Sequence, residues 1–272
     1  MRGFSNHLMK EIQHLFEAVQ QGDTATVRRF LADGISPNSQ DEKGYSLLSE
    51  SVKHPEIVQL LIDAGADVNL LDASGLAPIH ACVDYNTPDT IEILLRAGAD
   101  MYAETAYQEN AGILAANCSA GSLKMMKKLL SCGYDINHRS TTGKTMLMTS
   151  LGDNWETGTR WLLAHGAKTE VRDNEGDTAL FYGSCTNIYC STESLDALLE
   201  AGADINATNN LGNNALQAIT DLPLAEERTH EYLIEHGIDL HHRNKAGQTA
   251  FDLAKAHDNK SLMQLLISLE AD

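Results

Sequence analysis

The sequence of 272 residues lacks several features by which whole classes of protein are recognised. It has no run of lysine or arginine, and its formal net charge is −18. Because nucleic acids and anionic membranes attract basic surfaces, we expect neither as a partner, and a basic protein suits this charge better. Uninterrupted apolar runs are only a few residues long, whereas about 20 apolar residues are needed to cross a bilayer. The first residues hold no apolar core of a secretory signal.

The five cysteines also argue against two classes of protein. Their number is odd and they are scattered along the chain, which is untypical of a disulfide-stabilised secreted domain and fits a reducing compartment. Cys185 and Cys190 do not have the spacing of a zinc knuckle, and no second pair accompanies them. We therefore expect a cytoplasmic protein, with export to a host cell by a route without a cleaved signal left open.

No motif of catalysis or cofactor binding is present. Gly143-Lys144-Thr145 resembles the end of a phosphate-binding loop, but His138 stands where that loop needs a glycine. There is no Gly-x-Ser-x-Gly nucleophile turn. His241 and His242 are adjacent and have no third ligand nearby in sequence, so we expect them on an exposed hairpin. The sequence predicts no catalytic residue, no cofactor and no metal, and hence no enzyme.

What the sequence does contain is a repeated stretch, of which Leu60-Leu61-Ile62-Asp63-Ala64-Gly65-Ala66-Asp67-Val68-Asn69 is the clearest copy. Its seven copies are centred on the glycines at 34, 65, 98, 133, 166, 202 and 237. A second glycine follows ten residues later in six copies, at 44, 75, 143, 176, 212 and 247. After Gly98 the matching position falls at Asn110, which predicts an enlarged loop over 101–110.

Each part of the stretch has a physical reason. The paired leucines end an amphipathic helix and face the core. The glycine after them provides a helix stop with positive φ, and the second glycine lies in a polar turn. A short helix such as 76–82 follows, with Pro78 in its first turn, where a missing N–H costs nothing. One such two-helix unit cannot bury its apolar face alone, so neighbouring units must stack.

This organisation resembles the ankyrin repeat, whose Thr-Pro-Leu-His-x-Ala signature is similar to Ala77-Pro78-Ile79-His80-Ala81. Shorter likenesses occur at 178–180, 214–216 and 249–251, and the resemblance covers about 15–269. It implies an all-α solenoid of about eight stacked helix-turn-helix units with short hairpin fingers, in which the His80 ring holds a turn by hydrogen bonds. We expect one domain over 7–272, with units at about 7–38, 39–71, 72–103, 104–139, 140–172, 173–208, 209–243 and 244–272.

In a stacked repeat the fingers and first helices line an extended concave face, where we expect a protein partner to bind. Longer loops favour function, and three are expected, at 101–110, 186–193 and 220–226. Tyrosine and tryptophan supply binding energy and carboxylates attract a cationic partner. The alternative is that these aromatic residues fill space left by insertions. The expected contact residues are Asp84, Tyr85, Tyr107, Asp153, Trp155, Tyr182 and Tyr189.

The sequence favours a non-catalytic binding module that is a monomer on its own. An inhibitor or immunity protein, which captures an enzyme or toxin, is one specific form of this function. A host-directed effector using the same groove is an alternative from the family resemblance. An enzyme hidden on the scaffold is a third alternative, and no group of residues supports it.

Overall fold

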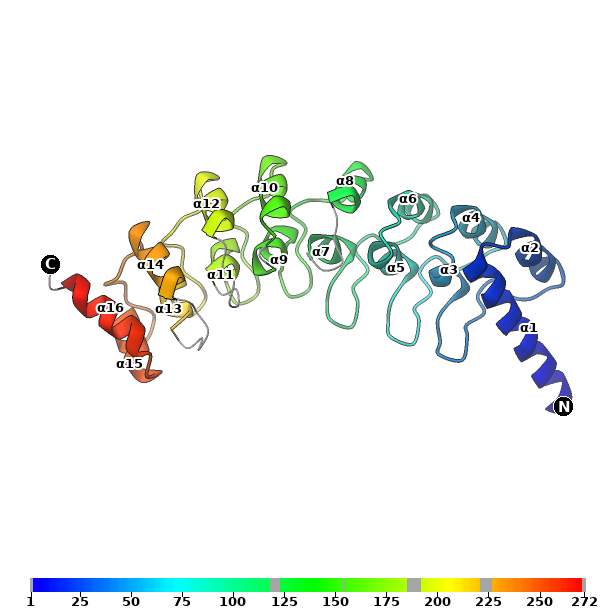
Figure 1. The fold of residues 1–272 in the computed structure, drawn as a ribbon, viewed down its shortest axis with the longest axis horizontal. Helices are drawn as coiled ribbons and strands as arrows, with labels where there is room; N and C mark the ends of the chain where they lie inside the picture. Colours follow the sequence, from blue (N-terminus) through cyan, green and yellow to red (C-terminus); the bar gives the residue numbers. More distant parts are fainter. Residues whose placement is uncertain (1, 118–122, 154, 185–191, 221–226, 271–272) are drawn as a thin grey trace. The chain divides into compact units, whose positions relative to one another are not determined.

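The computed structural model describes residues 2–117, 123–153, 155–184, 192–220 and 227–270. These residues form sixteen α-helices, and within these ranges the chain has no β-strand, only one antiparallel bridge between Gln40 and Ser46. The sixteen helices follow one another as eight successive pairs (Figure 1). The predicted all-α array of two-helix units is therefore confirmed.

Contacts divide the chain into two compact units. Unit 1 comprises Met1–Ala115 and Ser119–Asp135, and unit 2 comprises Ala116–Cys118 and Ile136–Asp272. The pairs of unit 1 are α1 (Arg2–Gln21) with α2 (Thr24–Ala32), α3 (Leu47–Glu50) with α4 (Pro55–Asp63), α5 (Pro78–Asp84) with α6 (Pro88–Arg96), and α7 (Ala111–Ala116) with α8 (Leu123–Ser131). Those of unit 2 are α9 (Met146–Gly152) with α10 (Glu156–Ala164), α11 (Ala179–Ser184) with α12 (Thr192–Glu200), α13 (Ala215–Ala218) with α14 (Glu227–Glu235), and α15 (Ala250–Ala256) with α16 (Lys260–Glu270).

The core of each two-helix repeat is built from the leucines that define the repeated stretch. The residue four positions before the first glycine has no exposed surface in six of the seven copies, and in the first copy it is the buried Phe30. Burying one such side chain stabilises the fold by about 1.5–3 kcal/mol. These residues are Leu61, Leu94, Leu129, Leu162, Leu198 and Leu233.

Both glycine registers have the backbone that the sequence predicted, with φ between +76° and +96°. The expected exception after Gly98 was wrong. Gln108 occupies the second glycine position, ten residues on, and has a φ of +63°. Asn110 instead takes the N-terminal position of α7, where its Oδ1 accepts hydrogen bonds from the backbone N–H groups of Gly112 and Ile113. The loop over 101–110 is therefore not enlarged; a glutamine has replaced a glycine in a loop of ordinary length.

We call the loop around the second glycine position of each repeat, which leads into the first helix of the next pair, a finger. The fingers share one hydrogen-bonded turn. In the finger of 72–76, Asp72 Oδ1 accepts from the backbone N–H groups of Ser74 and Leu76, at 2.8 and 2.9 Å. In the finger of 105–109 the Thr105 hydroxyl accepts from the corresponding two N–H groups. Within unit 1 the fingers extend from the first helices, away from the second helices (Figure 1). We call the surface formed by first helices and fingers the finger face.

Asparagines four residues after the first glycine join successive repeats. The side chain of Asn69 accepts from the Asp100 backbone N–H at 2.8 Å and donates to the Gly98 carbonyl at 3.2 Å. Since each such residue ties its own turn to the equivalent turn of the next copy, it fixes the spacing between neighbours. Asn38, Asn137 and Asn206 make the equivalent pair of bonds.

Other details of the sequence prediction have mixed outcomes. The helix α1 begins at Arg2, earlier than the expected boundary at residue 7. In the second pair α4 begins at Pro55, eight residues after the start of α3, whereas α6 begins ten residues after the start of α5, so this pair is two residues short as expected. The difference lies in the short helix α3 and not in the connection. His242 is not simply exposed, because its ring Nε2 donates to the Gly212 carbonyl at 2.7 Å. The loops expected at 186–193 and 220–226 lie almost wholly outside the described residues.

Candidate functional site

Three of the expected contact residues lie on the finger face of unit 1. Asp84 is the last residue of α5 and is exposed, and Tyr85 caps the same helix with 48% of its surface exposed. Tyr107 lies at a finger tip and is 86% exposed. These two tyrosines are therefore available for contact and do not act as filling for the core. The last residue of a helix and a finger tip are positions that the repeat itself presents to solvent.

Beside Tyr85 the finger face is hollowed to about 360 Å³ between α3 and α5. Tyr45 and Tyr85 line this hollow together with the carboxylates of Glu50, Asp72 and Asp84. Although Asp84 as a whole is exposed, its carboxyl is partly desolvated where the residue lines the hollow, and this disfavours the charged form and raises the pKa of the carboxyl; the nearby His80 opposes this effect. A group of carboxylates between aromatic rings is suited to a cationic, hydrogen-bond-donating side chain.

A smaller hollow of about 270 Å³ adjoins it, and Lys53 and Tyr85 are among the residues that line it. The Lys53 ammonium lies 3.8 Å from the centroid of the Tyr85 ring, in a cation–π contact. Gln20, from α1, donates to Glu50 at 2.7 Å and so orients this carboxylate. Side chains of three successive repeats therefore contribute to this part of the finger face.

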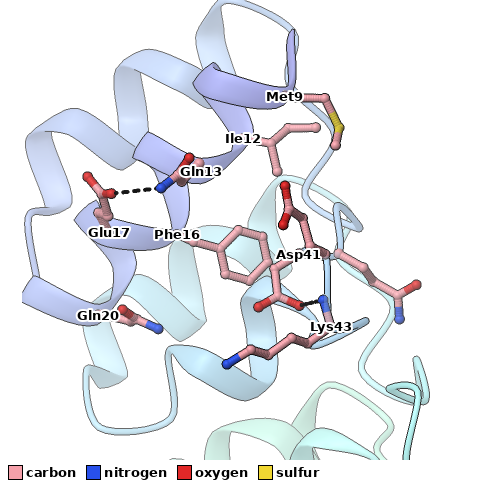
Figure 2. Close-up of a pocket in the computed structure, with 10 residues that line it drawn as sticks. Met9, Ile12, Gln13, Phe16, Glu17, Gln20, Asp41 and Lys43 are labelled. Carbon is pink, nitrogen blue, oxygen red and sulfur yellow. Dashed lines mark hydrogen bonds between the residues drawn. The ribbon is translucent and has the colours of Figure 1, made fainter. Parts of the chain in front are cut away.

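Sequence reasoning missed a third hollow, of about 460 Å³, beside α1. Figure 2 shows Met9, Ile12 and Phe16 projecting from α1 toward the finger that carries Asp41 and Lys43. Met9 is half exposed, whereas Phe16 is buried. None of the residues that line this hollow is among the expected contact residues. The N-terminal part of α1 borders a surface hollow.

The expected contact residues of unit 2 are engaged in packing to a greater degree. Trp155 precedes α10 and is half-buried, and its ring covers Gly158, where an added Cβ would come within 2.3 Å of a ring atom. Tyr182 is half-buried on α11, and its hydroxyl donates to Asp173 Oδ2 at 2.7 Å. Asp153 caps α9 and is half-buried. Tyr189 lies outside the described residues.

The polar residues that could have had a chemical role instead stabilise turns and helix ends. His80 is buried; its Nδ1 accepts from the Ala77 backbone N–H at 2.9 Å and its Nε2 donates to the Ala103 carbonyl at 2.8 Å. Thr145, from the segment resembling a phosphate loop, caps α9 by accepting from a backbone N–H. In the described part of the chain no three metal-binding side chains are grouped, and no helix there is long and apolar enough to traverse a bilayer.

Comparison with known proteins settles the family. A family model for ankyrin repeats, in three copies, matches residues 15–105 and 113–209. The chain belongs to the ankyrin-repeat family. Ankyrin-repeat domains generally bind protein partners and act as scaffolds without catalysis, so this chain has the fold of an interaction module.

Relatives and solved structures agree with this assignment. The ankyrin repeat protein YahD of Escherichia coli (strain K12) is 30% identical over 171 residues, which are 60% of this chain and 84% of YahD. The ankyrin repeat-containing protein P1E11.10 of Schizosaccharomyces pombe is 30% identical over 105 residues, and these span only 48% of its length. The crystal structure of the ankyrin repeat domain of Bcl-3 matches 81% of this ankyrin-repeat chain and 97% of its own, with a TM-score of 0.66 and 24% identity. That likeness shows the fold alone.

Proposed function

We propose that this ankyrin-repeat protein binds a basic protein partner, without catalysis, through its finger face. The observation that carries this proposal is the hollow on unit 1, in which Glu50, Asp72 and Asp84 surround two tyrosines. A net charge of −18 supports the same class of partner, because carboxylates steer and orient a cationic surface. The exposed Tyr107 adds a rigid aromatic contact beyond the hollow.

Site-resolved photo-crosslinking tests the proposal. A photoreactive phenylalanine derivative is introduced at Tyr107 or at Tyr85, and in a control protein at Glu56, an exposed residue of α4 away from the finger face. We expect both finger-face positions to crosslink to the same basic protein in cell extract, and the control position not to do so. Raising the salt concentration to 0.5 M should reduce the yield, because charge attraction is screened.

Two results would overturn this proposal. Equal crosslinking at Glu56 would place the contact elsewhere or make it non-specific. Capture of a partner with an acidic surface would remove the electrostatic reasoning. An inhibitor or immunity protein and a host-directed effector would use the same face, so the identity of the crosslinked protein separates these two roles. An enzyme or toxin as the partner indicates an inhibitor or immunity protein, and a protein of a foreign host indicates an effector. We propose a monomer in the absence of a partner, which light scattering measures directly.

A further inference from the structure

In unit 2, side chains of the protein itself occupy the position that corresponds to the hollow of about 360 Å³ in unit 1. Asp173 begins a finger, and its Oδ1 accepts from two backbone N–H groups of that turn. Its Oδ2 accepts from the Tyr182 hydroxyl at 2.7 Å. The ammonium of Lys144, from the preceding repeat, lies 5.4 Å from the centroid of the Tyr182 ring. A carboxylate oxygen, a hydrogen-bond donor, an aromatic ring and a cation therefore meet at one place.

Among the described residues, the corresponding place in unit 1 has the carboxylate and a ring, but no hydrogen bond to the second carboxylate oxygen and no cation at the position of Lys144. Asp72 matches Asp173, and nine residues later Ala81 stands where Tyr182 stands in unit 2. Tyr45, directly after a finger glycine, takes the position of Lys144. All three line the hollow of about 360 Å³.

The state of Asp72 makes this difference chemically important. Its side chain is only 8% exposed, and Oδ1 accepts from two backbone N–H groups as Asp173 does. Within the described part of the chain no donor reaches Oδ2. This oxygen is not among the buried side-chain atoms of the described residues that lack a hydrogen-bond partner, so water reaches it from the hollow, and a donor that enters the hollow would replace that water.

We propose that this hollow receives an arginine side chain of the protein partner. The inference deepens the proposed function and rests on it. A guanidinium supplies in one group what Tyr182 and Lys144 supply in unit 2, namely N–H donors for the carboxylate and a positive charge against an aromatic ring. Its planar, multiple donors also reach Glu50 and Asp84, which a compact ammonium with one charge centre does less well.

The chain contains a second indication that the rings at this hollow accept a cation. Lys53 places its ammonium 3.8 Å from the centroid of the Tyr85 ring, in the adjoining hollow. Tyr45 is the other ring of the hollow, and no cation–π contact to it occurs among the described residues. Tyr45 occupies the position that Lys144 has in unit 2. The ring in unit 1 therefore stands where unit 2 has its cation, and the incoming cation would stand where unit 2 has the ring of Tyr182. No lysine or arginine is among the residues that line the hollow of about 360 Å³.

Peptide binding tests the proposal directly. The probes are acetyl-Gly-Arg-Gly amide and the same peptide with citrulline, which keeps the shape and loses the charge, titrated into the full chain and followed by amide NMR shifts. We expect the arginine peptide to shift the signals of Ala81 and Tyr85 and to bind at least ten-fold more tightly than the citrulline peptide. Equal binding of the two peptides would overturn the proposal.

Three variants locate the site. Asp72→Asn should weaken binding about ten-fold and keep the finger, because Asn209 and Asn244 hold the same turn through Oδ1 in other repeats. Asp173→Asn is the matched control and should bind like the original protein. Ala81→Tyr should fill the hollow as Tyr182 does and abolish binding, with helix content by circular dichroism unchanged. Unaltered binding by a folded Ala81→Tyr protein would refute the assignment.

The same variant separates this inference from the function on which it rests. If Ala81→Tyr crosslinks to the basic partner at Tyr107 as efficiently as the original protein, arginine recognition in the hollow is wrong and protein binding stands. If the arginine peptide binds but no partner crosslinks at the finger face, the proposed function is wrong and the site stands.

Discussion

Replacing Gly143 by alanine should destabilise unit 2 more than the same change at Gly75 destabilises unit 1. Both glycines occupy the second register of the repeat, and both have positive φ, +84° and +76°. A Cβ at Gly143 would lie 2.7 Å from both Asn174 N and Asp173 Cα of the next finger, whereas at Gly75 the nearest atom is 4.0 Å away. The pair separates backbone strain from steric conflict between neighbouring fingers.

The magnitude follows from these distances. Holding a non-glycine residue at positive φ costs about 1–2 kcal/mol, and the stiffer unfolded chain returns about 0.4–1 kcal/mol, so Gly75→Ala should lose about 1 kcal/mol. At Gly143 the conflict with backbone atoms adds about 1–3 kcal/mol. Moving the finger away also weakens the 3.0 Å hydrogen bond from Asn174 N to Thr142 O, for about 1 kcal/mol more. The total for Gly143→Ala is about 3–5 kcal/mol.

Urea unfolding followed by circular dichroism measures the loss of stability of both variants. Hydrogen exchange at the Asn174 amide reports the finger contact separately, which matters because a repeat array need not unfold in one step. We expect faster exchange in Gly143→Ala and little change there in Gly75→Ala. If the two variants lose equal stability and Asn174 exchanges as in the original protein, the close approach of the two fingers does not contribute to stability.

Two further predictions concern single residues of unit 1. Burial lowers the pKa of His80, so the unfolded chain takes up a proton first as the pH falls, and this contribution to stability is complete above about pH 6.5 and lost below it. The His80→Gln protein should lose less stability between pH 7 and 5 than the original protein, because a glutamine does not titrate and Gln217 makes the equivalent pair of hydrogen bonds in another repeat. If the free energy of unfolding, measured in urea, falls equally with pH in both proteins, this prediction is wrong. Gln108→Gly should raise stability by about 0.5–1 kcal/mol by removing strain at positive φ, and a lower urea midpoint would show that the Gln108 side chain makes a contact of greater value.

Of the candidate site, the sequence indicated the exposed Tyr85 and Tyr107 because the repeat register alone places them at a helix end and a finger tip. It did not indicate that Trp155 covers Gly158, since this depends on the direction of a ring at the start of α10. It also missed the hollow at α1, because an apolar stripe on a terminal helix reads the same whether or not another element covers it.

The sequence by itself determined the two-helix unit, its number and its family, because leucine spacing and glycine positions act within a few residues of one another. Local constraints of this kind do not depend on what lies across the repeat. Only the tertiary structure decided which spots of the finger face are filled and which are open. Asp72 and Asp173 are equivalent in sequence, and their difference comes from Ala81 and Tyr182, side chains nine residues away that the stacking of helices brings beside them.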